Sequence, residues 1–329
     1  MSQLIFDRLL EAAGVTSAPD VWRTHWDAAQ SSFPLGGPDF LDPKYMENAN
    51  EILRLDDGKV SVLLKTADFY RKSDTLRRFI WLWHYVLFTA KERFDDWPAP
   101  ESLGEFGDLT HALVLIGALP ALKEQYHALG IGNEVMADTL SDLTVNMNEY
   151  HVRFGRPGIG AFRIGWLLNH FTGKLFRLGR LQFMLAPFNP VRPEDMALPI
   201  SPGDEILEVH IAKGSPLHYE ACQASYGFSA DFYARHFPAA KIKAFTCCSW
   251  LLSPDIDVLL PPNSNIIRFK KDFTVYDVSD SDGDVLDYVY ERRYDKMEDL
   301  PEDTSLRRAL KKSLLSGGRI RAASGAILY

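Results

Sequence analysis

Two ionisable side chains alternate along a short apolar segment in the second half of the chain. In EILEVHI, residues 205–211, Glu208 and His210 fall on one face of an expected strand, because side chains two residues apart point the same way. Either group can accept a proton from an attacking amine or hydroxyl, directly or through a water molecule. An exposed sheet face would carry the same polar residues. The pattern therefore indicates a candidate general base and leaves the exposed face as the alternative.

The loop after this segment has the composition of a phosphate-binding turn. Ser215 is a good helix N-cap and Pro216 suits the first helical position, so we expect a helix over residues 216–237. N–H groups at a helix start bind phosphate where a preceding glycine lets the backbone come close, and Lys213 adds positive charge. An ordinary helix cap explains the same short motif, which has low specificity. The candidate cofactor-binding residues in the loop are Ala212, Lys213, Gly214 and Ser215.

Two adjacent cysteines mark a second candidate strand, KIKAFTCCSWLL. Alternation sends Cys247 and Cys248 to opposite faces, so they cannot chelate one ion together. A nucleophilic cysteine needs a helix N-terminus or a cation to lower its pKa, and a mid-strand position supplies neither. We therefore expect Cys247 to be a buried small residue, with a cysteine-dependent transferase as the alternative. Ser249 is a candidate catalytic residue, and Cys247 and Trp250 are candidate binding residues.

Composition narrows the class of protein. The chain has 329 residues, 46% of them hydrophobic, and a net charge of −8, which disfavours a partner such as nucleic acid or an anionic membrane. Three cysteines make no disulfide framework, and no Cys or His spacing indicates a metal site. The first residues favour an amphipathic helix over a signal peptide, and no apolar run of about 18 residues predicts a membrane span. We expect a cytoplasmic protein without a metal.

The periodicity of apolar residues divides the chain into two domains. Residues 1–165 show helical spacing, with helices expected at 1–14, 18–30, 74–94, 108–130 and 133–155 and a break at Pro120 in the fourth. The stretch GRPGIGAFRIG separates them from residues 166–329, where spacing of two residues predicts strands. The expected fold class is α+β, with an all-helical N-terminal domain followed by a mixed-sheet domain with flanking helices.

The second domain is expected to contain five further elements besides those described. KLFRLGRLQFML alternates with a change of phase at Gly179–Arg180, which is typical of a β-bulge. NIIRFKKDFTVYDV and DVLDYVYERRY are predicted strands, PEDTSLRRALKKSLLSGG is a predicted helix, and RIRAASGAILY is a predicted final strand.

Four stretches resemble a bacterial family of two-domain acyltransferase-like proteins. They are GKLFRLGRLQF (173–183), LEVHIAKGSPL (207–217), FTCCSWLLSPDIDVLLPPNSNIIRF (245–269) and GAILY at the chain end. Members carry a helical N-acyltransferase N-terminal domain before a GNAT-like C-terminal domain, and the resemblance spans nearly the whole chain. It implies a GNAT-type sheet in which strand 205–211 leads to a pyrophosphate-binding loop at Lys213–Ser215.

The resemblance also implies a reaction. In GNAT enzymes the acyl thioester lies where two neighbouring strands separate, which here are 205–211 and 242–252. We expect an N-acyltransferase in which Glu208 or His210 accepts the proton of an amine and main-chain N–H groups of strand 242–252 polarise the thioester carbonyl. The alternative function is a non-catalytic small-molecule binding or sensor protein with the same fold.

The expected partners follow from this reaction. The co-substrate is coenzyme A in the form of acyl-CoA, and the acceptor is a small molecule. An acyl-carrier protein is the alternative donor, because residues 212–217 differ from the Arg/Gln-x-x-Gly-x-Gly/Ala loop of well-studied GNAT enzymes. The sequence does not specify acyl length, acceptor or oligomeric state.

Overall fold

The chain forms two compact units, Met1–Lys174 and Leu175–Tyr329. The computed structural model describes residues 2–192, 198–282, 285–291 and 294–329. Helix α10, which follows the glycine-rich stretch, belongs to the N-terminal unit.

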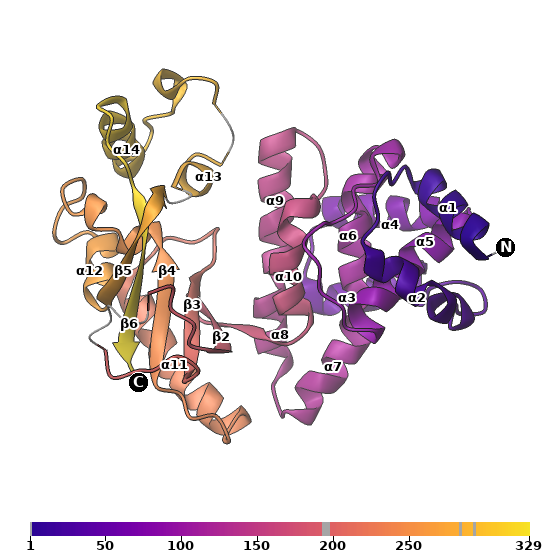
Figure 1. Cartoon of the computed structure of the whole chain (residues 1–329), viewed down its shortest axis with the longest axis horizontal. Helices are drawn as coiled ribbons and strands as arrows, with labels where there is room; N and C mark the ends of the chain where they lie inside the picture. Colours follow the sequence, from indigo (N-terminus) through magenta and orange to yellow (C-terminus); the bar gives the residue numbers. More distant parts are fainter. Residues whose placement is uncertain (1, 193–197, 283–284, 292–293) are drawn as a thin grey trace. The chain divides into compact units, whose positions relative to one another are not determined.

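The regular secondary structure described in the N-terminal unit is all helical, as the sequence predicts (Figure 1). Its α-helices are α1 (Ser2–Ala13), α2 (Asp20–Ser31), α3 (Pro43–Leu53), α4 (Asp57–Arg71), α5 (Asp74–His84), α6 (Glu105–Ile116), α7 (Leu119–Ala128), α8 (Asn133–Leu140), α9 (Asp142–Phe154) and α10 (Ile164–Phe171). The short 3-10 segments are η1 (Asp39–Leu41), η3 (Glu101–Leu103) and η4 (Ala161–Arg163), and the π-helical turn is η2 (Tyr85–Thr89).

Local signals start and stop these helices. The Ser73 hydroxyl accepts from the Leu76 N–H at 3.3 Å and caps α5. The predicted helix 133–155 is divided at Ser141 into α8 and α9, so that part of the prediction is wrong. The Ser141 hydroxyl donates to the Asp138 carbonyl at 2.6 Å, the kind of local bond by which serine competes with regular helix geometry.

Helix α6 is the centre of the N-terminal core. Residues Ala112 to Ile116 are fully buried, as expected for a helix that is apolar nearly all round. The predicted break occurs between α6 and α7, with Pro120 in the first turn of α7. Among the described residues, Glu105–Ala128 is long and apolar enough to cross a membrane by composition, but 67% of its most apolar window is buried in the protein. That burial is typical of a core helix.

The C-terminal unit contains a six-stranded sheet in the order β1-β2-β3-β4-β6-β5. The strands are β1 (Leu175–Leu178), β2 (Leu181–Pro187), β3 (Glu205–Ile211), β4 (Ala244–Ser249), β5 (Thr274–Asp282) and β6 (Arg321–Leu328). Its helices are α11 (Tyr219–His236), α12 (Asn265–Lys271), α13 (Val285–Val289) and α14 (Ser305–Leu315), and its 3-10 turns are η6 (Trp250–Leu252), η7 (Pro254–Ile256) and η8 (Met297–Asp299). Among the described strands, only β3 and β4 are parallel neighbours, which confirms a mixed, mainly antiparallel sheet.

The predicted β-bulge at Gly179–Arg180 is wrong. Leu178 pairs with Leu181, so the two residues between them form the turn of a β1–β2 hairpin. Gly179 has φ of +79°, a conformation that favours glycine, and a Cβ there would lie 2.9 Å from the Ser225 hydroxyl. A two-residue turn changes the phase of the alternation just as an inserted residue does, which is why the sequence pattern was ambiguous.

Two predicted strands are wholly or partly helical. The segment 265–278 divides into α12 and β5, because Ser264 caps a helix by accepting from the Ile267 N–H at 3.3 Å. Residues 285–289 of the second form α13, in which Val285 is buried and Tyr288 is exposed. The remainder of that predicted strand includes residues 284, 292 and 293, which lie outside the described residues.

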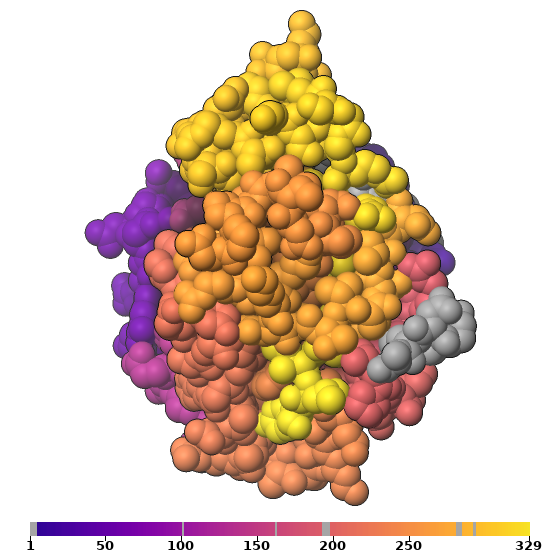
Figure 2. Space-filling model, turned by 90° about the vertical axis from the view of Figure 1, so that its left-hand side faces the viewer, coloured from indigo at the N-terminus to yellow at the C-terminus, as the bar shows by residue number. Residues whose placement is uncertain are grey.

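Helix α11 covers one face of the sheet. The Tyr233 hydroxyl donates to the Phe183 carbonyl at 3.2 Å, and the Phe176 and Phe232 rings lie 5.0 Å apart. Figure 2 shows one side of the C-terminal unit as a surface. The segments after β4, coloured orange and yellow, form its centre and top, and the end of β6 reaches the surface below them. The opposite face of the sheet carries Glu208 and His210.

Candidate functional site

The two parallel strands separate before either of them ends. Their register runs from Ile206–Ala244 to Glu208–Thr246 and stops there. Beyond this point β3 stays paired with β2 as far as Ile211, and β4 stays paired with β6 as far as Ser249. The facing edges of the two strands therefore diverge at the centre of the sheet, where the sequence resemblance places an acyl thioester.

Glu208 and His210 lie at this point of separation. His210 Nε2 is 3.5 Å from Glu208 Oε2, and their side chains are 30% and 38% exposed. The alternation of β3 explains why both point to the face opposite α11. The contact places two candidate proton acceptors side by side at the point where the strands separate.

Two further polar residues on the same face escaped the sequence interpretation. Gln182 stands directly across from His210 on β2, and Thr246 stands across from Glu208 on β4. Both are buried, with 1% and 7% of their surface exposed. Directly opposed residues have Cβ atoms about 5 Å apart, so these four residues form one polar group. In the sequence each is an isolated polar residue in an apolar strand, which does not by itself indicate a site. The pairing of β2 and β4 with β3 shows which residues they face.

The loop between β3 and α11 is longer than predicted. Residue Tyr219, not Pro216, begins the helix, and His218 precedes it without a side-chain cap. The expectation that Ser215 caps α11 is therefore wrong, because the His218 N–H bonds to the Pro216 carbonyl at 3.0 Å and forms a separate turn. Gly214 has φ of +88°, so the loop needs glycine at this position.

Lys213 contacts the segment after β5. Its Nζ lies 3.4 Å from the Asp287 carbonyl and 5.1 Å from the centre of the Tyr288 ring. Cation–π contact with an exposed ring is worth about 0.5–1 kcal/mol. The positive charge of Lys213 is therefore directed toward α13 in this structure.

Arg180, in the β1–β2 hairpin turn, binds the same loop. Its guanidinium donates to the carbonyl oxygens of Ala212, Ser215 and Pro216 at 3.0, 2.8 and 2.9 Å. The change of phase at Gly179–Arg180 was the sequence signal at this position, but it did not reveal a partner more than thirty residues later.

The cysteine strand is shorter than predicted. Strand β4 ends at Ser249, and Trp250 begins the 3-10 turn η6, so the alternation expected to reach Trp250 fails there. The Ser249 hydroxyl accepts from the Leu251 N–H at 3.2 Å, which caps that turn. Trp250 is 9% exposed and packs in an apolar cluster with Leu251 and Ile256.

The two adjacent cysteines differ in burial. Cys247 is buried and Cys248 is exposed, consistent with side chains on opposite faces. Burial, with a smaller contribution from Cys248, raises the pKa of the Cys247 thiol well above its ordinary value. A thiol in this state is a poor nucleophile. Within residues 2–192, 198–282, 285–291 and 294–329, no three His, Cys, Asp or Glu side chains come together as a metal site.

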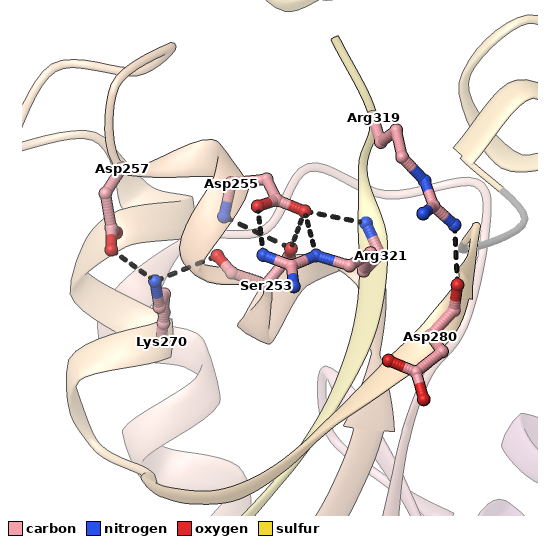
Figure 3. Close-up of polar contacts among 7 residues, drawn as sticks. All are labelled: Ser253, Asp255, Asp257, Lys270, Asp280, Arg319 and Arg321. Atoms are coloured by element: carbon pink, nitrogen blue, oxygen red, sulfur yellow. Dashed lines mark hydrogen bonds and ion pairs between the residues drawn. The ribbon is translucent and has the colours of Figure 1, made fainter.

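The segment after β4 is anchored to β6 by a carboxylate (Figure 3). Asp255 Oδ1 accepts from Arg321 Nη2 at 2.7 Å, and Asp255 Oδ2 accepts from Arg321 Nε and from the Arg321 main-chain N–H, both at 3.0 Å. The Ser253 hydroxyl donates to Asp255 Oδ2 at 3.1 Å. Bonding to the Arg321 guanidinium holds the pKa of Asp255 well below its ordinary value.

Lys270 ties the same segment to α12. Its Nζ donates to the Ser253 carbonyl at 2.8 Å and to Asp257 Oδ2 at 2.6 Å (Figure 3). Together the two anchors hold the segment that follows Ser249 against β6 and α12.

Sequence comparison assigns both units to known domain families. Residues 45–173 match the N-acyltransferase N-terminal domain, and residues 175–327 match the GNAT-like C-terminal domain. The chain therefore carries both domains that the resemblance in its sequence predicts, in the predicted order. No curated protein matches the chain.

Solved structures share the fold over nearly the full length. An acyltransferase in complex with decanoyl-CoA and teicoplanin is 22% identical, with a TM-score of 0.79 and 98% of each chain covered. An acyltransferase in complex with CoA and 10C-teicoplanin is also 22% identical, with a TM-score of 0.80 and the same coverage. A further acyltransferase in complex with decanoyl-CoA is 24% identical, with a TM-score of 0.67, and covers 86% of this chain and 98% of its own.

Proposed function

We propose that the protein is an N-acyltransferase that moves an acyl group from acyl-CoA to an amine. The observation that carries this proposal is the separation of β3 and β4 beyond Glu208–Thr246, with Glu208 and His210 at the point of divergence. Main-chain groups on diverging strand edges need hydrogen-bond partners, and an extended pantetheine chain can supply them in the manner of an added strand.

The polar group on this face suits the chemistry of aminolysis. The neutral amine nitrogen attacks the thioester carbonyl carbon, and Glu208 or His210 accepts the proton that the nitrogen loses as the new C–N bond forms. Main-chain N–H groups at the end of β4 stabilise the negative charge on the carbonyl oxygen. The C–S bond then breaks, and CoA leaves as a thiolate that takes up a proton.

The remaining candidate residues have supporting roles in this proposal. Ala212, Lys213, Gly214 and Ser215 belong to the loop that receives the CoA pyrophosphate. Cys247 and Trp250 help to shape the end of β4, and Ser249 acts through the turn that it caps rather than as a nucleophile.

The similar solved structures hold decanoyl-CoA, CoA or teicoplanin, so a medium-chain acyl-CoA is the first donor to test, with a small-molecule amine as acceptor. We also propose that the protein is cytoplasmic.

The test is acyl transfer by the purified protein. Octanoyl-, decanoyl- and palmitoyl-CoA are offered with a panel of amine acceptors, and release of free CoA thiol is followed together with the mass of the acylated product. We expect thiol release that depends on the acceptor. Quenching of tryptophan fluorescence that saturates with acyl-CoA, without turnover on any amine, would favour the sensor function instead. Turnover with an acylated carrier protein but not with any acyl-CoA would show that the carrier protein is the donor.

A further inference from the structure

The geometry points to Arg180 as a positioning residue that holds the β3–α11 loop in the form that receives the pyrophosphate of CoA. This inference rests on the proposed function and assigns a role to a residue outside the loop itself. Arg180 belongs to the β1–β2 turn, and its guanidinium reaches the carbonyl oxygens of three loop residues at 2.8–3.0 Å.

The loop curves so that three of its carbonyl oxygens bind one guanidinium. Ala212 begins the loop and Pro216 lies near its end, yet both carbonyls meet the same guanidinium. Gly214, between them, has the positive φ that lets the chain reverse. A planar guanidinium offers five N–H donors in a fixed arrangement, so it can hold several carbonyls at set angles where an ammonium group cannot.

The bonded carbonyls determine where the loop N–H groups point. In a trans peptide the carbonyl of one residue and the N–H of the next are antiparallel. Since the Ala212 and Pro216 carbonyls point at Arg180, the N–H groups of Lys213 and Leu217 point away from it. The Ser215 carbonyl precedes Pro216, which has no N–H. Negative carbonyl ends are thus gathered on one side, and N–H donors are presented on the other, as an anion requires.

The arginine is itself held firmly. The N–H groups of Arg180 and Leu181 donate to the Ser225 hydroxyl at 2.8 and 3.3 Å, and that hydroxyl donates to the Ala221 carbonyl at 2.9 Å. Ser225 lies on α11 and is 1% exposed. Both ends of Arg180 therefore contact the strand–loop–helix unit, its main chain at α11 and its guanidinium at the loop before α11. Burial lowers the pKa of Arg180, but a guanidinium remains charged at neutral pH.

The test compares Arg180→Gln and Arg180→Lys with Arg177→Gln in the full chain. Arg177 lies on β1 three residues earlier, and its Nε contacts the Gly179 carbonyl at 3.4 Å, so its replacement removes the same charge from the same hairpin. Binding of CoA is measured by calorimetry. Initial rates are measured with decanoyl-CoA and with S-decanoyl-pantetheine, a thioester that lacks the pyrophosphate.

We expect Arg180→Gln to raise the Kd for CoA about tenfold or more, because part of three charge-assisted hydrogen bonds is lost from the loop. The KM for decanoyl-CoA should rise with it, while kcat at saturation stays within about twofold. The rate with S-decanoyl-pantetheine should not change. Arg180→Lys should also weaken CoA binding, because a lysine keeps the charge without the planar arrangement of donors. Arg177→Gln should bind CoA as the wild type does.

The outcomes separate this inference from the proposed function. If the wild type binds neither CoA nor acyl-CoA, the proposed function fails and the inference fails with it. If the wild type binds CoA and Arg180→Gln binds it equally well, only the inference is overturned. Equal loss with decanoyl-CoA and S-decanoyl-pantetheine would indicate general damage to the fold, and wild-type binding by Arg180→Lys would show that charge alone suffices. Either of these results also overturns the positioning role.

Discussion

The two strands that separate at the centre of the sheet continue into segments stabilised by opposite charges. After β3, a guanidinium gathers three main-chain carbonyls, so the loop presents N–H donors on its other side. After β4, a carboxylate binds Arg321 through both oxygens and also accepts from a main-chain N–H and a hydroxyl. The Asp255 charge is thus compensated by the protein itself.

This difference indicates a division of labour around the site. Because the Arg180 guanidinium binds the loop carbonyls, the loop N–H groups on the other side can bind an external anion. The Asp255 carboxylate, in contrast, already accepts hydrogen bonds from protein donors through both oxygens, so we do not expect it to bind a ligand. We therefore expect changes after β3 to alter ligand binding and catalysis, and changes after β4 to alter stability. The predictions that follow test this contrast in order of decreasing effect.

The largest effect is expected at Glu208 and His210, on β3. Removing a general base lowers the rate of proton transfer by about 10²–10⁴-fold, so Glu208→Gln or His210→Gln should lower kcat by at least about a hundredfold for the residue that accepts the proton. The other substitution should have a smaller effect, and the Kd for CoA should change little in both. Initial rates and calorimetry on the same preparations distinguish the two residues. Full activity in both variants would exclude this pair as the base.

The anchor after β4 should contribute mainly to stability. Asp255→Asn keeps the shape but removes the charge that binds Arg321, and we expect a loss of about 1–2 kcal/mol in the free energy of unfolding, since the pair is only partly shielded from solvent. Asp257→Asn is the matched control, because Asp257 is 53% exposed and binds Lys270 alone among the basic residues of Figure 3. Denaturant unfolding measures both. Retained CoA binding by Asp255→Asn is part of the expectation, and its loss would contradict the contrast.

Acid should weaken the same anchor. The folded state holds the pKa of Asp255 below its ordinary value, so unfolding takes up a proton as the pH falls below about 4. The contribution of Asp255 is therefore complete at neutral pH and is lost progressively in acid. The difference in unfolding free energy between wild type and Asp255→Asn should shrink as the pH is lowered from about 6 to 3. A difference that stays constant over this range would mean that the charge is not the source of stability.

A smaller effect is expected for Lys213, after β3. Its Nζ already contacts the Asp287 carbonyl and the Tyr288 ring, so it contributes to phosphate binding only at the expense of those contacts. Lys213→Ala should raise the Kd for CoA about threefold to fivefold, less than Arg180→Gln does. Lys243→Ala, which removes a lysine before β4, is a charge-matched control. A larger loss from Lys213→Ala than from Arg180→Gln would reverse the assignment.

The smallest effect on catalysis is expected at Cys247, on β4. Its thiol is buried and its pKa is raised by that burial, so it is not poised to attack a thioester. Cys247→Ala should keep kcat within about twofold and lower stability by roughly 1 kcal/mol, because it leaves a small cavity. Cys248→Ala changes an exposed thiol and serves as the control. Loss of acyl transfer in Cys247→Ala alone would support the cysteine-dependent reaction instead.

Local patterns predicted the elements that depend on one strong signal. The alternation of Glu208 and His210 with apolar residues correctly placed both side chains on one face. The prediction was wrong where two periods fit the same residues. Ile267 and Phe269 fit the alternation of a strand, but they are the buried residues of α12, which begins after the Ser264 cap.

The sequence alone determined the two-domain division by periodicity, the charged and polar composition of the β3 face and the glycine in the following loop. These features depend on neighbouring residues, whose relations the backbone period specifies. Only the tertiary structure decided that Gln182 and Thr246 join Glu208 and His210 and that Arg180 binds the loop. The resemblance predicted that β3 and β4 separate, but only the structure showed that they do so after Thr246. Each of these depends on strand register or on contacts between distant segments, because hydrogen bonding and packing act between atoms that folding brings close, whatever their separation along the chain.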